Sequence, residues 1–255
     1  MTSITYAKTN TPSIPQPALS YLGSTGKEIY ENIQDRFLFL LEFIKDPFAN
    51  GSIAPSSLQL TKKMLRYIPK NSETPNPQGR VYLEVGAGTG AFTKIIIERL
   101  KPSDHLDVVE LNPFYCKKLN SKFKHCQNVH IHCLSITDWN PDYQYDTVIS
   151  GLPLNGFTPE LVEKCLNTFK KLTKAGGKVS YFDYPIFPKL FTKLYWGKKR
   201  KNYIKLLDIK NQFFLNYGIH KELVKENFPT ANVQHFSLGR QNDETPQVPP
   251  LPNTP

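Results

Sequence analysis

Alternation of short apolar runs with amphipathic stretches, between residues 81 and 183, limits the fold of this 255-residue chain more than any other feature. The apolar runs are typical of strands and cover residues 81–85, 106–111, 129–134, 146–151 and 178–183. Helical spacing appears between them at residues 92–100, 113–123 and 159–172. Strands that alternate with helices at this spacing predict an α/β fold, in which a parallel sheet carries helices on both faces.

The flanking segments differ in composition and predict the domain organisation. Residues 1–24 are rich in Ser, Thr and Pro, the tail 241–255 is polar and proline-rich, and we expect both to be disordered. A single domain is expected over residues 25–240, with N-terminal helices in 25–68. The first of these covers about 27–45, and the second starts at Ser56 or Ser57 and runs to Met64. Residues 186–217 read as mostly helical, and two last strands are expected at about 219–226 and 231–238.

Charge and cysteine usage narrow the class of protein. The net charge is +10, which predicts an anionic partner such as nucleic acid, a membrane face or an acidic protein. No secretory signal is apparent at the start of the chain, and the apolar run 37–44 is too short to span a bilayer. The cysteines form no CxxC pair and no framework spacing, so we expect reduced thiols and a cytoplasmic protein; they are Cys116, Cys126, Cys133 and Cys165. The six histidines are scattered and predict no metal site, although His130 and His132 share one face of an expected strand.

The stretch "VYLEVGAGTGAF", residues 81–92, ends a strand in three glycines at alternate positions, Gly86, Gly88 and Gly90. Glycines at the first strand-to-helix turn of such a sheet let the backbone approach a ligand closely. Glu110 ends the next strand, where a carboxylate can accept both hydroxyls of a ribose. The pair favours a nucleotide-type ligand over a purely structural turn. The spacing is G-x-G-x-G after Glu84, whereas dinucleotide sites use G-x-G-x-x-G.

This pattern resembles motif I of the class I S-adenosylmethionine-dependent methyltransferases. The resemblance covers residues 81–183 and implies a Rossmann-like, seven-stranded sheet that is mostly parallel with one reversed strand. It implies S-adenosylmethionine as cofactor and no metal. Ser135 stands where many relatives have an aspartate that binds the adenine, so backbone groups near Ile136 are an alternative. The cofactor-binding residues implied are Glu84, Gly86, Ala87, Gly88, Gly90, Glu110, Leu111, Ser135, Ile136 and Ser150.

Three further stretches, "GSIAPSS", "SGLPL" and "ENFPTANVQHF", resemble those of bacterial phosphatidylethanolamine N-methyltransferases, with Thr230 in place of a proline. This second resemblance spans residues 35–238 and implies methyl transfer to the amine of a phospholipid headgroup. Catalytic roles are implied for Ser150, Gly151, Leu152 and Tyr181, and substrate contacts for Ser56, Ser57 and Pro153. Asp183 and Tyr184 are additional candidates as proton acceptors or cation-binding groups.

A basic and aromatic segment from Pro188 to Lys210 fits a phospholipid substrate, because cations meet anionic headgroups and Trp and Tyr favour the interface. We therefore expect a cytoplasmic enzyme that associates peripherally with an anionic membrane surface. The sequence leaves two alternatives open. One is a ribosomal RNA adenine methyltransferase, although Leu154 stands where an aromatic would stack on the base. The other is a cofactor-binding protein without turnover. The sequence does not indicate the oligomeric state.

Overall fold

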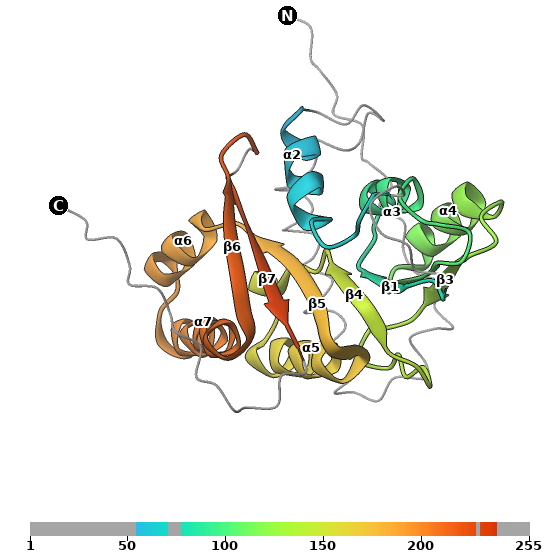
Figure 1. Ribbon diagram of the computed structural model, residues 1–255. Coiled ribbons are helices and arrows are strands. Elements are labelled where there is room, and N and C mark those ends of the chain that lie inside the picture. The colour runs from blue at the N-terminus through green and yellow to red at the C-terminus, as the bar shows by residue number, and fades with distance from the viewer. Residues whose placement is uncertain (1–54, 71–77, 228–229, 239–255) are drawn as a thin grey trace, which may run out of the picture. The chain divides into compact units, whose positions relative to one another are not determined.

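The computed structural model describes residues 55–70, 78–227 and 230–238 (Figure 1). The side chains of residues 55–57 and of Lys189 are outside this description. The expected helix at 27–45 and both expected disordered segments also lie outside it, so the predicted domain boundaries stay predictions.

Seven strands form one sheet in the order β3-β2-β1-β4-β5-β7-β6. Strand β7 runs antiparallel to both neighbours, β5 and β6, while all other pairs are parallel. The predicted α/β fold with one reversed strand is therefore confirmed. The strands are β1 Val81–Val85, β2 His105–Glu110, β3 Val129–Cys133, β4 Tyr145–Ser150, β5 Thr173–Asp183, β6 Gly218–Val224 and β7 Ala231–Ser237.

Helices cover both faces of the sheet. In Figure 1, α2, α3 and α4 lie on one side of it and α5 and α7 on the other. The sheet order turns back at β1, and right-handed crossovers on either side of that point place their helices on opposite faces. The helices are α2 Pro55–Met64, α3 Ala91–Ile97, α4 Pro113–Phe123, α5 Pro159–Leu172, α6 Ile186–Leu194 and α7 Gly197–Tyr217, with a short 3₁₀ turn η2 at Leu154–Gly156.

The bounds of α4 and α5 agree with the prediction because local sequence signals fix them. Asn112 caps α4 by accepting a hydrogen bond from the amide of Phe114 at 2.9 Å, and a proline opens the helix. Thr158 caps α5 in the same way through the amide of Leu161 at 3.3 Å, again before a proline. Capping residues followed by proline are strong start signals, since proline has no amide hydrogen to leave unpaired.

Strand β5 is five residues longer than expected, starting at Thr173 immediately after α5 rather than at residue 178. Thr173 pairs with Tyr145 of β4 across an irregular register. Farther along, the amide of Gly176 donates to the carbonyl of Leu238 at 2.6 Å, and the amide of Leu238 to the carbonyl of Gly177 at 3.1 Å. These distant partners extend the strand, and the glycine-containing sequence "TKAGG" gives no local sign of them.

The expectation of four reduced thiols is wrong, because Cys116 and Cys133 form a disulfide. Cys116 lies in the first half of α4 and Cys133 ends β3, with 5.8 Å between their Cα atoms. The crossover from β2 through α4 to β3 brings together two residues that are 17 apart in sequence. Cys126 and Cys165 are free thiols.

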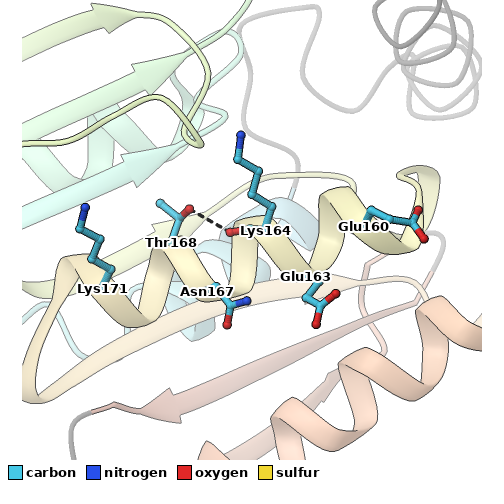
Figure 2. Close-up of a pocket in the computed structure, with 6 residues that line it drawn as sticks. All are labelled: Glu160, Glu163, Lys164, Asn167, Thr168 and Lys171. Atoms are coloured by element: carbon cyan, nitrogen blue, oxygen red, sulfur yellow. Dashed lines mark hydrogen bonds between the residues drawn. The ribbon is translucent and has the colours of Figure 1, made fainter. Parts of the chain in front are cut away.

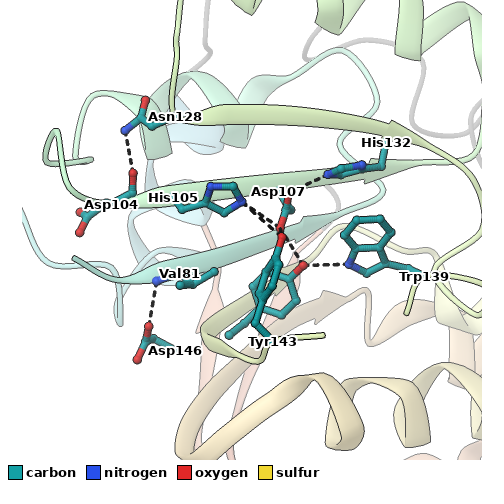
Figure 3. Close-up of polar contacts among 10 residues, drawn as sticks. Val81, Asp104, His105, Asp107, Asn128, His132, Trp139, Tyr143 and Asp146 are labelled. Carbon is teal, nitrogen blue, oxygen red and sulfur yellow. Dashed lines mark hydrogen bonds and ion pairs between the residues drawn. The ribbon is translucent and has the colours of Figure 1, made fainter. Parts of the chain in front are cut away.

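The buried carboxylate of Asp107 in β2 is the centre of a network of polar contacts (Figure 3). Its oxygens accept hydrogen bonds from Tyr143 at 2.7 Å and Tyr145 at 2.8 Å, and lie 2.6 Å from Nε2 of His132 and 3.1 Å from Nε2 of His105. Burial alone would raise the pKa of Asp107, but the hydrogen bonds outweigh it and lower the pKa to about 2. The network ties the β3–β4 connection to the sheet.

An unbroken series of aromatic contacts runs from α3 to the end of α6. Neighbouring ring centroids in this series are 5.1–6.1 Å apart. The rings belong to Phe92, Phe182, Tyr184, Phe187, Phe191 and Tyr195. Such contacts add about 0.5–1.5 kcal/mol per pair beyond the burial of area, so they hold α6 firmly against the end of β5.

Candidate functional site

The carboxyl ends of β1, β2 and β4 meet at one edge of the sheet. The amide of Gly86 donates to the carbonyl of Val109 at 2.8 Å, and the amide of Gly151 donates to the carbonyl of Val85 at 2.8 Å. A Cβ on Gly151 would lie 2.7 Å from the carbonyl oxygen of Gly86, so only glycine lets these two turns touch. The structure therefore brings together the glycine-rich turn, the end of β2 and the turn after β4, as the sequence predicted.

All three glycines of the first turn have positive φ, with values of 70° at Gly86, 55° at Gly88 and 81° at Gly90. Their surroundings differ. A Cβ on Gly90 would press against Leu119 and Phe123 of α4, so this glycine serves helix packing. At Gly88 nothing lies within 4 Å of the Cβ position. The open side of the turn is thus at Gly88, and this is where the backbone can approach a ligand.

Glu110, the last residue of β2, lies next to the glycine-rich turn. It is 4% exposed, and its Oε2 accepts a hydrogen bond from the amide of Gly88 at 2.8 Å. Its Oε1 accepts one from the amide of Asn112, also at 2.8 Å. The carboxylate is therefore held at the end of β2 beside the glycine turn, and each oxygen keeps a second lone pair for a hydroxyl group.

Glu84, at the penultimate position of β1, is fully buried between Val108 and Ile149 on the neighbouring strands. Within the described residues, neither of its carboxylate oxygens has a hydrogen-bond partner, nor does the nearby hydroxyl of Thr93. Burial raises the pKa of Glu84 to about 7, and the hydroxyl and backbone amide of Thr93 lie close enough to limit this rise without forming a hydrogen bond of normal geometry. An unpartnered buried carboxylate is costly, so its place under the glycine turn indicates a polar or cationic group that the protein alone does not supply.

Ser135 and Ile136 follow β3 in a tight turn. The hydroxyl of Ser135 is hydrogen-bonded to the hydroxyl of Thr137 at 2.9 Å. It also accepts a hydrogen bond from the backbone amide of Thr137 at 3.3 Å, so Ser135 stabilises the turn. Ile136 is buried, whereas Leu111, just after Glu110, is 45% exposed. Leu111 is thus an apolar side chain left open at the end of β2.

The turn after β4 holds most of the residues implied in catalysis. Ser150 is completely buried, and its Oγ accepts a hydrogen bond from the amide of Leu152 at 3.3 Å. The carbonyl of Leu152 accepts from the amide of Leu154 at 2.9 Å. Among the described residues, no donor reaches the carbonyl of Gly151. Ser150 therefore shapes the turn, while Gly151 keeps a free acceptor; Pro153 is half-buried.

Tyr181 on β5 lies beside Ser150 in the sheet register and is 1% exposed. Its ring stacks on Phe236 with centroids 5.4 Å apart. Burial raises its pKa well above the usual value, so the phenol is a hydrogen-bond donor rather than a base. Ser56 and Ser57 are in the first turn of α2, and their side chains are outside the described part of the structure.

Sequence reasoning missed a buried lysine close to these residues. Lys210 of α7 is 5% exposed, and its Nζ donates to Oδ1 of Asn155 at 2.6 Å and to Oδ2 of Asp183 at 2.7 Å. The buried positions of α7 are Tyr203, Leu206, Lys210 and Phe213. A lysine at a position of the apolar stripe was the available signal.

A shallow hollow on the outer face of α5 contains none of these groups (Figure 2). All of its lining residues belong to one helix: Glu160, Glu163, Lys164, Asn167, Thr168 and Lys171. Nor does any cluster of three or more His, Cys, Asp or Glu side chains suited to a metal ion occur among the described residues. In the same part of the chain, no helix has the length and apolar character needed to cross a membrane.

Comparison with known proteins gives consistent matches. A family model described as a methyltransferase domain matches residues 83–177. An ornithine lipid N-methyltransferase from Singulisphaera acidiphila is 32% identical over 151 residues, which cover 57% of this chain and 76% of that protein.

Among solved structures, the N-methyltransferase NodS from Bradyrhizobium japonicum WM9, in complex with S-adenosylhomocysteine, matches with a TM-score of 0.54 and 14% identity. The match covers 76% of this chain and 92% of that one. The 1,6-didemethyltoxoflavin-N1-methyltransferase of Burkholderia thailandensis matches with a TM-score of 0.57 and 11% identity, over 92% of this chain and 98% of the other. At these identities the two structures support the fold.

Proposed function

The chain belongs to the class I S-adenosylmethionine-dependent methyltransferases, and on that premise we propose that it methylates the amine of a phospholipid headgroup at a membrane surface. The headgroup we propose is of the phosphatidylethanolamine type. The similarity to an enzyme named for N-methylation of a lipid supports this substrate class. Ethanolamine and ornithine headgroups share a primary amine, which is the acceptor chemistry that the two have in common.

The described residues fit S-adenosylmethionine, the cofactor of this family. Glu84 offers an unpartnered buried carboxylate, which suits an ammonium group such as that of the cofactor's methionine end. Glu110 and the open side of Gly88 suit a ribose, and the exposed Leu111 suits the flat apolar face of an adenine. When bound, the cofactor supplies an electrophilic methyl group on a sulfonium. The chain must then hold the acceptor nitrogen in line with it.

The observation that carries the lipid assignment is the outer face of α6. Phe187 and Phe191 point inward and are buried, while Ile186, Leu190 and Leu194 recur every four residues and are 39–58% exposed. Trp196, just beyond the helix, is 84% exposed. An exposed apolar row of this kind next to a tryptophan is typical of a helix that lies in the headgroup region of a bilayer.

Positive charge continues directly from this apolar row. Four consecutive exposed side chains begin α7, namely Lys198, Lys199, Arg200 and Lys201. Basic side chains near an anionic bilayer contribute about 1 kcal/mol each. We call α6, Trp196 and these four cations the docking face. It follows β5 directly, so a docked lipid would have its headgroup near the carboxyl ends of the strands.

The test of the function is methyl transfer with labelled S-adenosylmethionine. Wild-type protein is incubated with vesicles containing phosphatidylethanolamine, with vesicles containing ornithine lipid, with phosphatidylcholine vesicles as a control without an acceptor amine, and with ribosomal RNA. We expect label in the ethanolamine lipid. If only ornithine lipid is labelled, the proposal of a lipid substrate stands and the proposed headgroup is wrong. If only RNA is labelled, the proposal is overturned.

The docking face has its own test. Changing Lys198, Lys199, Arg200 and Lys201 together to Gln should reduce binding to anionic vesicles by at least tenfold, and more at low salt than at high salt. A matched control changes four other exposed lysines: Lys117, Lys118, Lys124 and Lys164. Equal co-sedimentation of the two variants would show that net charge, rather than this face, drives binding.

A further inference from the structure

Beneath the turn after β4 lies a buried polar network that none of the implied site residues explains. Lys210 of α7 bridges Asn155 in η2 and Asp183 at the end of β5. Gln234 of β7 donates from Nε2 to the same carboxylate oxygen, Oδ2 of Asp183, at 3.1 Å. Side chains from four separate elements thus form one network, in which Lys210 and Gln234 bind the carboxylate of Asp183 directly and Asn155 binds Lys210.

A network of buried charged groups adds little to the stability of a fold. Removing a lysine and an aspartate from water is costly, and a protein with apolar residues of similar volume in their place is often as stable or more so. Its place is also specific. Asn155 is four residues beyond Gly151, whose amide donates to the carbonyl of Val85 in β1 and where an added Cβ would lie 2.7 Å from the carbonyl oxygen of Gly86. The network is therefore attached to the same turn that faces the cofactor position.

Asp183 is not fully satisfied by these contacts. Lys210 and Gln234 both bind Oδ2, and within the described residues no hydrogen bond reaches Oδ1. The side chain is 11% exposed, so one oxygen can be reached from outside. A carboxylate held rigidly by one oxygen, with the other free, is arranged to accept a hydrogen bond or a proton from a ligand.

Two unpartnered hydroxyl groups lie near this carboxylate. The phenol oxygens of Tyr181 and Tyr203 are buried and have no hydrogen-bond partner among the described side chains or backbone. Burial raises the pKa of both phenols, and the negative charge of Asp183 raises them further. Both phenols are therefore neutral donors without an acceptor. Together with the free oxygen of Asp183, they indicate that a polar ligand group belongs here.

We propose that Asp183 is the proton acceptor for the methyl-accepting amine and that Lys210 and Asn155 are the residues that position it. This assignment rests on the proposed function, because it requires a substrate that arrives as an ammonium ion. Lys210 provides the opposite charge that a carboxylate needs at this depth and fixes Oδ2. Oδ1 then receives an N–H group of the incoming lipid headgroup.

The step balances without any further reactant. An N–H bond of the lipid ammonium breaks, the proton moves to Oδ1 of Asp183, and the electron pair stays on nitrogen. The nitrogen uses this pair to bond the methyl carbon, whose bond to sulfur breaks with both electrons remaining on sulfur. The methylated nitrogen is again cationic, and Asp183 returns its proton to water as the product leaves.

The experiment measures kcat and KM between pH 6 and 10 with phosphatidylethanolamine vesicles, together with cofactor affinity by calorimetry and the melting temperature. Asp183→Asn should lower kcat at pH 7 by about 100-fold, the lower end of the range for general-base groups, while cofactor affinity stays within twofold of wild type. Its residual activity should rise steadily with pH, because only free amine then reacts. Asp208→Asn, an exposed aspartate on α7, is the matched control and should resemble wild type.

Lys210 needs a readout that a merely structural role would not change. Lys210→Met should lower kcat and give the pH profile of Asp183→Asn, while Lys210→Arg should restore the wild-type profile. Lys205, also on α7, forms an exposed ion pair with Glu160 of α5, and Lys205→Met should leave the profile unchanged. A stability loss without a changed profile would overturn the positioning role.

The outcomes separate this inference from the proposed function. If wild-type protein methylates no lipid amine, the proposed function fails. If wild type methylates the lipid and Asp183→Asn keeps kcat within threefold with an unchanged profile, the inference alone fails. Should Asp183→Asn not fold, Asp183→Glu retains a carboxylate in a displaced position. Its kcat should fall with the wild-type pH dependence preserved, and a profile that rises steadily would overturn the assignment.

Discussion

Glu84 and Asp107 are both buried carboxylates in the same sheet, on neighbouring strands, and the protein treats them in opposite ways. Asp107 is surrounded by four donor side chains, and its pKa is lowered to about 2. Glu84 has no hydrogen-bond partner among the described residues, and its pKa is raised to about 7. Similar burial thus coexists with opposite pKa shifts, because hydrogen bonding decides the sign.

The difference separates a carboxylate that the fold itself satisfies from one that, on our proposal, a bound cofactor satisfies. Asp107 is satisfied within the protein and fixes the β3–β4 connection, so its contribution is to stability. Glu84, next to the glycine turn, has no hydrogen-bond partner among the described residues, and we propose that a bound cofactor supplies one. Glu110 is intermediate, since each of its oxygens receives one backbone amide.

The largest expected effect is on folding. Asp107→Ala leaves two phenols and two imidazoles without their acceptor, and it should reduce the free energy of unfolding by about 3–5 kcal/mol. Urea denaturation measures this, with Asp142→Asn, an exposed carboxylate in the same connection, as control. Cofactor affinity of the folded fraction should stay near wild type. A large loss of affinity would end the distinction between the two acids.

The next effect is on cofactor binding. Glu110→Ala removes the proposed acceptor for the ribose hydroxyls, and it should weaken S-adenosylmethionine binding at least 100-fold, since hydrogen bonds to a charged group are worth about 1.5–3 kcal/mol each. The fold should persist, because the backbone amides of Gly88 and Asn112, which donate to Glu110 in the wild type, can donate hydrogen bonds to water instead. Calorimetry and circular dichroism measure the two properties. Near-normal affinity would refute the ribose assignment.

A smaller effect is on pH dependence. Because the folded pKa of Glu84 is raised to about 7, its stabilising contribution is complete below the unfolded pKa of about 4.5 and is lost as pH rises through 7. Asp107 behaves oppositely, since its contribution is present above about pH 4 and is lost as pH falls through about 2.

Melting temperatures of cofactor-free wild type and Glu84→Gln, measured from pH 5 to 9, should diverge with increasing pH as only the wild type loses stability. The measured quantity is the difference in melting temperature between the two proteins. It is used because burial lowers the pKa of His235 to about 4, so this residue makes the stability of both proteins rise with pH between 4 and 6.5. Parallel curves would mean that Glu84 is satisfied in the folded protein.

The smallest expected effect is the affinity of Glu84→Gln. Loss of the charge opposite an ammonium group should weaken cofactor binding about tenfold, or about 1.4 kcal/mol, at pH 8. Thermal stability at that pH should increase, which is the reverse of the Asp107 result. An unchanged dissociation constant would show that Glu84 does not face the cofactor.

Local sequence signals were sufficient for much of the fold and for part of the site. The bounds of capped helices such as α4 and α5 could be predicted to the residue. The glycine turn and Glu110 lie side by side as expected, while their role in binding the cofactor stays a prediction. Contacts between residues distant in the sequence could not be predicted from it. The start of β5 depends on Tyr145 and Leu238, and the disulfide depends on how α4 crosses over β3.

The side chains around Asp107 and Asp183 were beyond sequence reasoning for the same physical cause. Three of the four side chains around Asp107 lie 25 to 38 positions away, with only His105 nearby in sequence, and Lys210 hydrogen-bonds to residues 27 and 55 positions away. No periodicity encodes such pairs. Only the polar residue at an apolar position, Asp107 in a strand or Lys210 in a helix stripe, marks them beforehand.

The aromatic series from Phe92 to Tyr195 has a geometric consequence. Phe92 follows the last glycine by two residues, and Tyr195 ends α6, so rings in continuous contact join the cofactor turn to the docking face. Close-packed rings transmit displacement because they cannot interpenetrate. On the proposal that α6 lies on a lipid surface, its tilt would also fix the height of the glycine turn above the bilayer plane, and with it the distance over which a headgroup has to reach the methyl group.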